Sequence, residues 1–327
     1  MKIIVTGAAG LIGSATIHHL NLQGEFDILA VDHLGTSEKW KNLRALKFDD
    51  YIEKDKFLTI LEGKNNFFDA DAIIHLGACS STTELDASYL VHNNFEYTKT
   101  LATYSVSNKI RFLYASSAAT YGDGSQGYHD DENHIETLCP LNMYGYSKQL
   151  FDLWAKRHNL LNKIAGMKFT NVYGPNEAHK GAMRSMVCRA YEQICSTGEV
   201  SLFRSYCPQY ADGEQMRDFI YVKDAVKMIC FLLGNPELNG LFNIGSGYPE
   251  TWNHLAKSVF YALQKEPKIK YIDMPPQLIN KYQYFTCADM NKMFNAGYTE
   301  KLMTLEDAIK DYVINYLIPN RHLGEEK

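Results

Sequence analysis

The stretch Thr6-Gly7-Ala8-Ala9-Gly10-Leu11-Ile12-Gly13 decides the fold. It follows an apolar run, residues 2–6, and opens a segment, residues 11–23, with apolar positions at helical spacing. Glycine permits a tight turn and leaves no Cβ between the backbone amides and a ligand. The amino terminus of a helix offers unpaired N–H groups to an anion. The stretch therefore predicts a strand, a turn and a helix that bind a phosphate-bearing ligand through Gly7, Gly10, Leu11, Ile12 and Gly13.

The same alternation continues along the chain. Further strands are predicted at 27–32, 72–76, 111–116 and 165–170, and helices at 94–107 and 144–159. These apolar runs lack polar alternation, which is typical of a parallel sheet covered on both faces. The pattern predicts an α/β protein with a doubly wound parallel sheet. The second half predicts a helix at 181–197, a loop at 200–212, a strand at 217–224 leading into a helix at 224–233, a strand and turn at 242–247, and a helix at 251–265.

Two lobes are expected from this order. We assign residues 1–170, with about 217–240, to a dinucleotide-binding domain, and residues 171–216 and 241–320 to a smaller substrate-binding lobe. A ligand cleft is expected between them. The tail after Leu323 is expected to fray.

The composition points to a small-molecule ligand. The formal net charge is −5 and no long basic run occurs, which argues against nucleic acid and anionic membranes as partners. No apolar stretch is long enough to span a bilayer. The seven cysteines are scattered without a CxxC pair, which argues against a disulfide framework and against a metal site. We therefore expect a cytoplasmic protein.

Asp32 bears on the choice of dinucleotide. It ends the second predicted strand about twenty residues after the glycine turn, where an acid can bond the adenosine ribose. This position favours NAD. His33 and Lys39 follow closely, and either could contact a 2′-phosphate, although Lys39 could equally be a solvated surface lysine. We favour NADP and leave NAD open.

A tyrosine and a lysine form a YxxxK pair in Tyr144-Gly145-Tyr146-Ser147-Lys148. Four positions apart on a helix, Tyr144 and Lys148 share one face. A phenol with a pKa of about 10 is a poor base at neutral pH, but a neighbouring ammonium group lowers that pKa. Ser117, at the end of a predicted strand, can bond a substrate hydroxyl. Tyr144 could be an ordinary half-buried aromatic residue, but glycine turn, serine and YxxxK in this order favour catalysis.

Seven motifs together resemble the extended short-chain dehydrogenase/reductase superfamily. They are TGAAGLIG at 6–13, HLGA at 75–78, SSAATYG at 116–122, YGYSK at 144–148, NVYGP at 171–175, RDFIYVKD at 217–224 and FNIGSG at 242–247. The resemblance implies a Rossmann-type fold and, in most members, a nucleotide-linked sugar as substrate. Nucleotide-sugar dehydratases of this superfamily carry an Asp-Glu pair after the catalytic Ser/Thr. Here Ala118 and Ala119 occupy those positions, which favours an epimerase or a simple dehydrogenase.

Further motifs are similar to the ADP-L-glycero-D-manno-heptose 6-epimerase family. They are residues 77–84 (GACSSTTE), 177–181 (EAHKG) and 281–286 (KYQYFT). The chain departs from that family at His33 and Ala182 and in a longer loop within 200–216. The resemblance implies epimerisation of ADP-heptose at C6″, for the heptose of the lipopolysaccharide core, by transient oxidation and re-reduction with bound NADP.

The resemblance also implies roles for individual residues. Tyr144 and Lys180 would act as acid/base groups on opposite sides of the carbon, Lys148 would hold the nicotinamide ribose, and Ser117 would bond the reacting oxygen. Lys180 could instead be a loop lysine that contacts cofactor or phosphate. The implied cofactor contacts are Gly7, Gly10, Leu11, Ile12, Gly13, Asp32, His33, Lys39, Lys54, Leu76, Gly77, Ala78, Cys79, Ser80, Asn93, Lys148, Val172 and Lys180. The implied substrate contacts are Ser80, Asn171, Ala182, Arg189, Phe203, Arg204, Ser205, Arg217 and Tyr282.

Other interpretations stay open at this point. The chain could be another nucleotide-sugar epimerase, such as a UDP-hexose 4-epimerase, or a net dehydrogenase. A non-catalytic dinucleotide sensor is disfavoured because it needs no acid/base set. The resemblance further implies a homo-oligomer, with a pentamer as one form.

Overall fold

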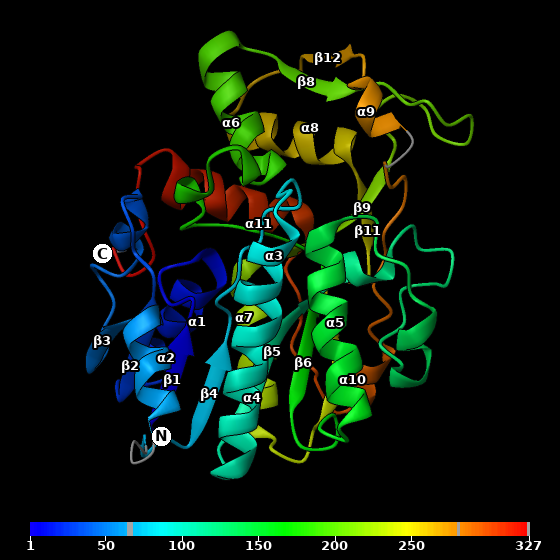
Figure 1. Cartoon of the computed structure of the whole chain (residues 1–327). Coiled ribbons are helices and arrows are strands. Elements are labelled where there is room, and N and C mark those ends of the chain that lie inside the picture. Colours follow the sequence, from blue (N-terminus) through cyan, green and yellow to red (C-terminus); the bar gives the residue numbers. More distant parts are fainter. Residues whose placement is uncertain (64–67, 280–281, 326–327) are drawn as a thin grey trace.

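A seven-stranded parallel sheet forms the body of the computed structural model, which describes residues 1–63, 68–279 and 282–325. The strand order is β10-β6-β5-β4-β1-β2-β3 (Figure 1). The strands are β1 (Ile3–Thr6), β2 (Ile28–Asp32), β3 (Asp50–Glu53), β4 (Ala72–His75), β5 (Arg111–Ser117), β6 (Ala165–Phe169) and β10 (Gly240–Ile244). All neighbouring pairs are parallel. The predicted doubly wound sheet is confirmed.

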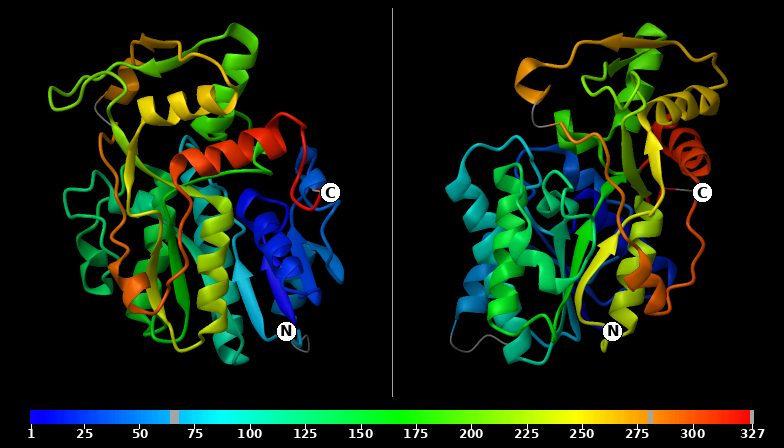
Figure 2. Two further views of the ribbon diagram at one scale, coloured as in Figure 1. Left: turned by 180° about the vertical axis from the view of Figure 1, so that it is seen from behind. Right: turned by 90° about the vertical axis from the view of Figure 1, so that its right-hand side faces the viewer.

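Helices cover both faces of this sheet. Figure 1 shows α2 (Lys54–Glu62), α4 (Tyr97–Ser107) and α5 (Met143–Arg157) on the near face. The view from behind in Figure 2 shows α1 (Leu11–Leu22) and α7 (Val222–Gly234) on the other. Because successive strand residues point to opposite faces, the sheet supplies two cores. Ile4, Ile73 and Phe112 pack in one core, and Val5, Ile74 and Leu113 pack in the other.

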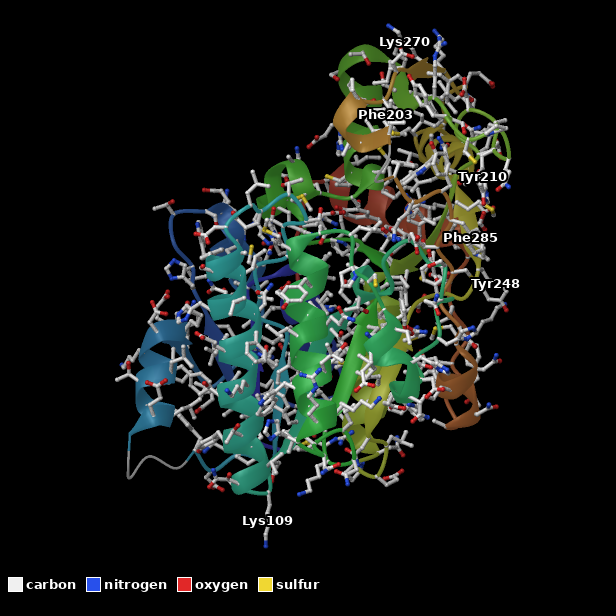
Figure 3. The ribbon with its side chains drawn as sticks, turned by 45° about the vertical axis from the view of Figure 1, so that its right-hand side comes forward. Lys109, Phe203, Tyr210, Tyr248, Lys270 and Phe285 are labelled. Atoms are coloured by element: carbon white, nitrogen blue, oxygen red, sulfur yellow. The ribbon has the colours of Figure 1, made fainter. Side chains whose placement is uncertain are left out.

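A smaller lobe stands beyond the carboxyl ends of these strands. It contains α6 (Met186–Thr197), α8 (Trp252–Ala262), α9 (Pro276–Ile279) and a parallel pair, β8 (Val200–Phe203) with β12 (Ile269–Ile272). Figure 3 shows Phe203, Tyr210 and Lys270 in this lobe and Lys109 at the opposite end of the molecule. A three-stranded sheet, β11 (Pro249–Thr251), β9 (Met216–Tyr221) and β7 (Asn171–Tyr173), lies between the lobe and the large sheet, with α11 (Leu305–Tyr312) beside it.

The remaining elements are short. They are α3 (Ala87–Leu90), α10 (Asn291–Asn295), the π-helical segments η2 (Val91–Glu96) and η6 (Val313–Leu317), and the 3-10 segments η1 (Glu38–Asn42), η3 (Ala118–Tyr121), η4 (Glu132–Thr137) and η5 (Ala178–Met183). In the described ranges, no helix is long and apolar enough to cross a membrane.

Several expectations about single elements were wrong. The strand β3 and helix α2 were not predicted, because half of β3 is exposed and its sequence Asp-Tyr-Ile-Glu looks polar. Val200–Phe203 is a strand, although we expected a loop. The helix expected at 181–197 begins only at Met186, since Gly181 has a φ of 54°. The tail after Leu323 was expected to fray, but Glu325 pairs with Arg44 at 2.6 Å; residues 326 and 327 lie outside the described residues.

Two segments lie elsewhere than the expected division placed them. β10 pairs with β6 at the edge of the large sheet, although residues from 241 onward were expected in the substrate lobe. β9 belongs to the three-stranded sheet, although residues 217–240 were expected in the large sheet's domain. The chain crosses between the lobes in short single strands. The residue composition does not change at these crossings, so the sequence does not reveal where they occur. Lys281 of the last motif lies outside the described residues.

Candidate active site

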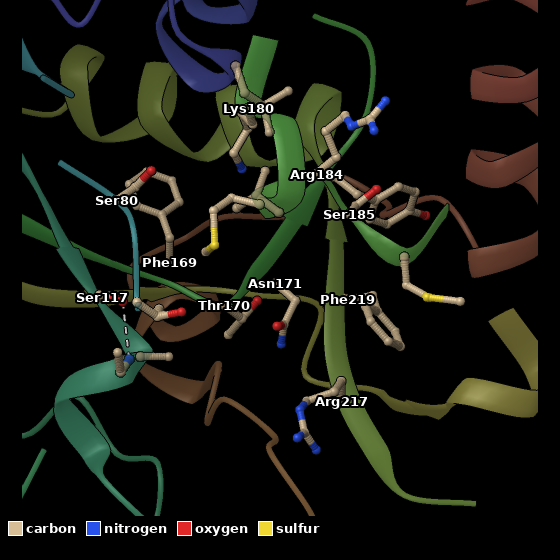
Figure 4. Close-up of a pocket in the computed structure, with 18 of the residues that line it drawn as sticks. Ser80, Ser117, Phe169, Thr170, Asn171, Lys180, Arg184, Ser185, Arg217 and Phe219 are labelled. Carbon is tan, nitrogen blue, oxygen red and sulfur yellow. Dashed lines mark hydrogen bonds between the residues drawn. The ribbon is translucent and has the colours of Figure 1, made fainter. Parts of the chain in front are cut away.

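A cavity of about 850 Å³ opens between the lobes, at the carboxyl ends of the sheet strands, where ligands of open α/β sheets bind. It brings together most of the site residues expected from the sequence: Gly7, Gly10, Leu11, Ile12, Gly13, Asp32, Lys39, Leu76, Gly77, Ala78, Ser80, Ser117, Tyr144, Lys148, Asn171, Val172, Lys180, Arg189, Phe203, Arg217 and Tyr282. Figure 4 shows Lys180, Ser117 and Arg217 reaching the cavity from three different segments.

The glycine turn is built so that only glycine fits. Gly7 has a φ of +69°, and a Cβ there would lie 2.6 Å from the amide nitrogen of Gly77. A Cβ on Gly13 would collide with the carbonyl of Gly7. Within the described part of the chain, no side chain caps the amino terminus of α1, so the first-turn amides are open to a phosphate beside the cavity. The turn therefore fits the pyrophosphate of a dinucleotide.

Asp32 stands at the end of β2, beside the turn. Its carboxylate accepts hydrogen bonds from the backbone N–H groups of Ala9 and His33, each at 2.7 Å. It also pairs with the ammonium group of Lys39 at 2.6 Å. The negative charge of Asp32 is therefore balanced before any ligand arrives, and Lys39 lies where the adenosine ribose would be held.

Tyr144, Lys148 and Ser117 form the chemical centre. Lys148 is 4% exposed, and its Nζ donates to the carbonyl of Ala115 at 2.8 Å. Burial lowers the pKa of Lys148 to about 8, against the attraction of Asp152. Burial raises the pKa of Tyr144, and a hydrogen bond with Ser117 opposes that rise. A phenol hydrogen-bonded to a hydroxyl, with an ammonium group one helical turn away, can move a proton to and from an alcohol oxygen.

Lys180 lies on η5, and the hydrogen bonds of Glu177 hold this segment in place. The carboxylate of Glu177 is fully buried and accepts from the Ser185 hydroxyl at 2.6 Å, from the Ser185 amide, and from the Tyr312 hydroxyl at 3.1 Å. Burial raises the pKa of Glu177, and these hydrogen bonds oppose the rise. The loop that carries Lys180 is thus tied to α11.

Asn42 joins the glycine turn to this loop and to the carboxyl-terminal tail. It is 2% exposed, and its side-chain amide donates to the carbonyls of Ala9 and Asn176, each at 2.9 Å. Its oxygen lies 2.9 Å from the ring of His322. Asn176, which has a positive φ of 74°, in turn accepts from the amide of Leu323 at 3.0 Å. We name these five residues the asparagine hub.

Arg217 is the strongest candidate for binding an anionic substrate. Arg217 is 8% exposed, and the carbon of its guanidinium group lies 5.6 Å from the ring centroid of Trp252 and 5.0 Å from that of Tyr282. Burial lowers its pKa. Among the residues that the structure describes, no carboxylate pairs with it. A buried guanidinium group without an acid is suited to a ligand phosphate.

Some expected contacts do not line the cavity: His33, Lys54, Cys79, Asn93, Ala182, Arg204 and Ser205. His33 turns outward toward Glu53, and Arg204 lies near Asp273 at 3.8 Å. Lys54 donates to Asn93 at 2.8 Å, so these two residues satisfy each other. These seven residues could contact a ligand in the cavity only if the segments that carry them were arranged differently.

The sequence reasoning missed other residues at the cavity. His179 and Arg184 line it on either side of Lys180. Burial, followed by the charges of Lys39 and Lys180, lowers the pKa of His179 to about 4. His179 stands inside a motif that was quoted for Lys180, so its neighbourhood was a usable signal. Arg184 had none.

The match to a family model defines the class of this protein. Residues 3–245 match the model of the NAD dependent epimerase/dehydratase family, so the chain belongs to that family and is an enzyme whose family uses a nicotinamide dinucleotide.

Its relatives are more specific. An ADP-L-glycero-D-manno-heptose-6-epimerase of Nitratidesulfovibrio vulgaris is 54% identical, covering 96% of this chain and 97% of the relative. One of Fusobacterium nucleatum is 48% identical, covering 96% and 98%. The crystal structure of the Helicobacter pylori ADP-L-glycero-D-manno-heptose-6-epimerase has a TM-score of 0.76 at 25% identity, covering 96% of this chain and 95% of that one. The resemblance inferred from the motifs is confirmed.

Proposed function

We propose that this protein inverts C6″ of ADP-D-glycero-D-manno-heptose to give ADP-L-glycero-D-manno-heptose. One observation carries the chemistry: Tyr144, Lys148, Ser117 and Lys180 share one cavity with the glycine turn. Ala118 and Ala119 also line this cavity. No acid therefore stands at these two positions to expel a hydroxide, as a dehydratase would require. The names of the relatives support the heptose substrate.

The residues divide the work as follows. A bound nicotinamide dinucleotide supplies the oxidation and the re-reduction. Tyr144 takes the proton from the C6″ hydroxyl, because the ammonium group of Lys148 favours its phenolate. Ser117 holds the reacting oxygen. When the ketone presents its other face, Lys180 gives a proton to the ketone oxygen; Tyr144 then releases its proton to solvent and Lys180 takes one up. Arg217 holds the pyrophosphate while both faces are presented in turn.

We propose NADP as the cofactor. A free carboxylate at Asp32 would repel a 2′-phosphate, but Lys39 balances that charge at 2.6 Å. Mass spectrometry of the dinucleotide released from the purified protein decides between NADP and NAD. Lys39→Ala should weaken binding of NADP more than binding of NAD, and equal weakening would favour NAD.

The proposal extends to organisation. We propose a dinucleotide lobe built on the large sheet and a substrate lobe built on α6, α8 and β8, in a homo-oligomer whose size light scattering would measure. A cytoplasmic location is supported by the seven free thiols. The product would supply heptose for the lipopolysaccharide core.

The test of function follows inversion directly. Nuclear magnetic resonance at C6″ should show conversion of the D-glycero to the L-glycero sugar with no net change in nicotinamide absorbance. Inversion at C4 of a UDP-hexose, or release of reduced cofactor, would overturn the proposal.

Two variants test the assigned roles. Tyr144→Phe should lose activity and keep its cofactor. Normal epimerisation by Lys180→Met with cofactor bound would remove Lys180 from the mechanism.

A further inference from the structure

A buried ion pair lies behind the chemical centre. Asp152 follows Lys148 by four residues on α5, which places both on one face of the helix. Its carboxylate is fully buried and lies 2.8 Å from the ammonium group of Lys168, which is 1% exposed and belongs to β6. Neither side chain is among those that line the cavity. Direct contact with a ligand therefore does not explain the pair.

Hydrogen bonds connect this pair to the strand end that carries the catalytic serine. Asp152 accepts from the hydroxyl of Ser116 at 2.7 Å. Lys168 donates to the hydroxyl of Thr120 at 2.7 Å, and Thr120 donates to the carbonyl of Ser117 at 2.8 Å. The pair thus fixes α5 against β5 at the point where Tyr144, Lys148 and Ser117 meet.

The charges of the pair also act on Lys148. Asp152 and Cys79 act on the charge of Lys148, and the charge of Lys148 acts on His75. His75 ends β4 and Cys79 lies in the loop after it. Tyr144 precedes Lys148 by four residues and so shares its face of α5. The pKa of His75 is lowered well below its usual range by burial, so His75 is neutral. Asp152 is then the carboxylate that favours the charged form of Lys148, and Lys168, paired with it at 2.8 Å, balances the charge of that carboxylate.

We propose that Asp152 and Lys168 are positioning residues that set the charge on Lys148. This inference rests on the proposed function only for its effect on turnover. Stability alone does not require such a pair, because a buried ion pair can often be replaced by apolar side chains at no cost. An apolar pair could not supply a carboxylate whose attraction for Lys148 is weakened by a neighbouring positive charge, and Lys148 must remain charged.

The two charges predict shifts of opposite sign. Asp152→Asn removes an attraction and leaves Lys168 repelling Lys148, so the titration midpoint of Lys148 should fall by about one pH unit. Lys168→Met leaves Asp152 unopposed, so the midpoint should rise. Lys168→Arg keeps the charge and should leave the midpoint at the wild-type value.

The measurement is direct. Protein labelled with carbon-13 at lysine Cε is titrated by nuclear magnetic resonance, and the Lys148 signal is assigned by its loss in Lys148→Met. This reading needs no turnover, so it stands or falls independently of the epimerase activity. With substrate, the alkaline limb of the pH–rate profile should move in the same direction as each midpoint.

A single variant could fail to fold because it leaves one charge buried and unpaired. The double variant Asp152→Asn with Lys168→Met has no unpaired charge, and its midpoint should lie between those of Asp152→Asn and the wild type. Shifts of the same sign in the two single variants, or a double variant above the wild type, would overturn the proposal.

Discussion

Replacing Arg217 by methionine should stabilise the protein and damage its function. Arg217 is 8% exposed and lies against Trp252 and Tyr282, and burying such a charge without an acid costs several kcal/mol. Methionine relieves that cost and loses about 1 kcal/mol of cation–π attraction and about 1 kcal/mol for the hydrogen bond to Met216. The free energy of unfolding of the ligand-free protein should therefore rise by roughly 1–3 kcal/mol.

The effect on substrate has the opposite sign. Two charge-assisted hydrogen bonds to a pyrophosphate are together worth about 3 kcal/mol, which corresponds to roughly a 150-fold loss in kcat/KM. Urea unfolding and steady-state kinetics measure the two effects on one preparation. Arg157→Met on the exposed surface of α5 is the matched control and should change neither. An Arg217→Met protein that is less stable and has an unchanged kcat/KM would refute the reasoning.

Three other outcomes follow from the site. Because the pKa of Lys148 is lowered to about 8, its ammonium group is present below that pH and lost above it, and the pH–rate profile should show activity falling above pH 8. A folded Lys148→Arg variant cannot lose its charge, so its activity should not fall in this range. Glu177→Ala leaves the hydroxyl groups of Ser185 and Tyr312 without their buried acceptor, so the free energy of unfolding measured in urea should fall by about 2–4 kcal/mol. The control Glu199→Ala, at an exposed position, should leave that free energy unchanged. Deleting residues 322–327 removes the buried side chain of Leu323 and the contact of His322 with the asparagine hub. The rate of cofactor release, followed by fluorescence, should rise about tenfold, which corresponds to about 1.4 kcal/mol. An unchanged rate would show that these residues do not help to retain the cofactor.

The large sheet was predictable because its strands carry strong local signals. Runs such as Ile3-Ile4-Val5 are buried on both faces and apolar throughout, and the glycine turn is forced by close backbone contacts. β3 lacked such a signal, since it lies at the edge of the sheet and its pairing with β2, rather than its own sequence, makes it a strand. β8 is also defined by pairing, with β12 almost seventy residues later.

The candidate site was predictable where the reactive residues belong to a local sequence motif. Tyr144, Lys148 and the glycines were identified because their spacing has a local meaning. Asn42, Asp152 and Lys168 were not, because their value comes from partners on distant elements. Single asparagine, aspartate and lysine residues within helices and strands have many ordinary explanations, and only the fold shows which ones are buried together.

The asparagine hub bears on how the protein is made. His322 meets Asn42 across 280 positions, so this contact cannot form until residue 322 has been synthesised. Elements near the amino terminus, including the glycine turn, leave the ribosome long before residues 322 and 323, which contact Asn42 and Asn176. Contacts of such wide separation form late in folding. We therefore expect the nascent protein to form its glycine turn before residues 322 and 323 dock on Asn42 and Asn176.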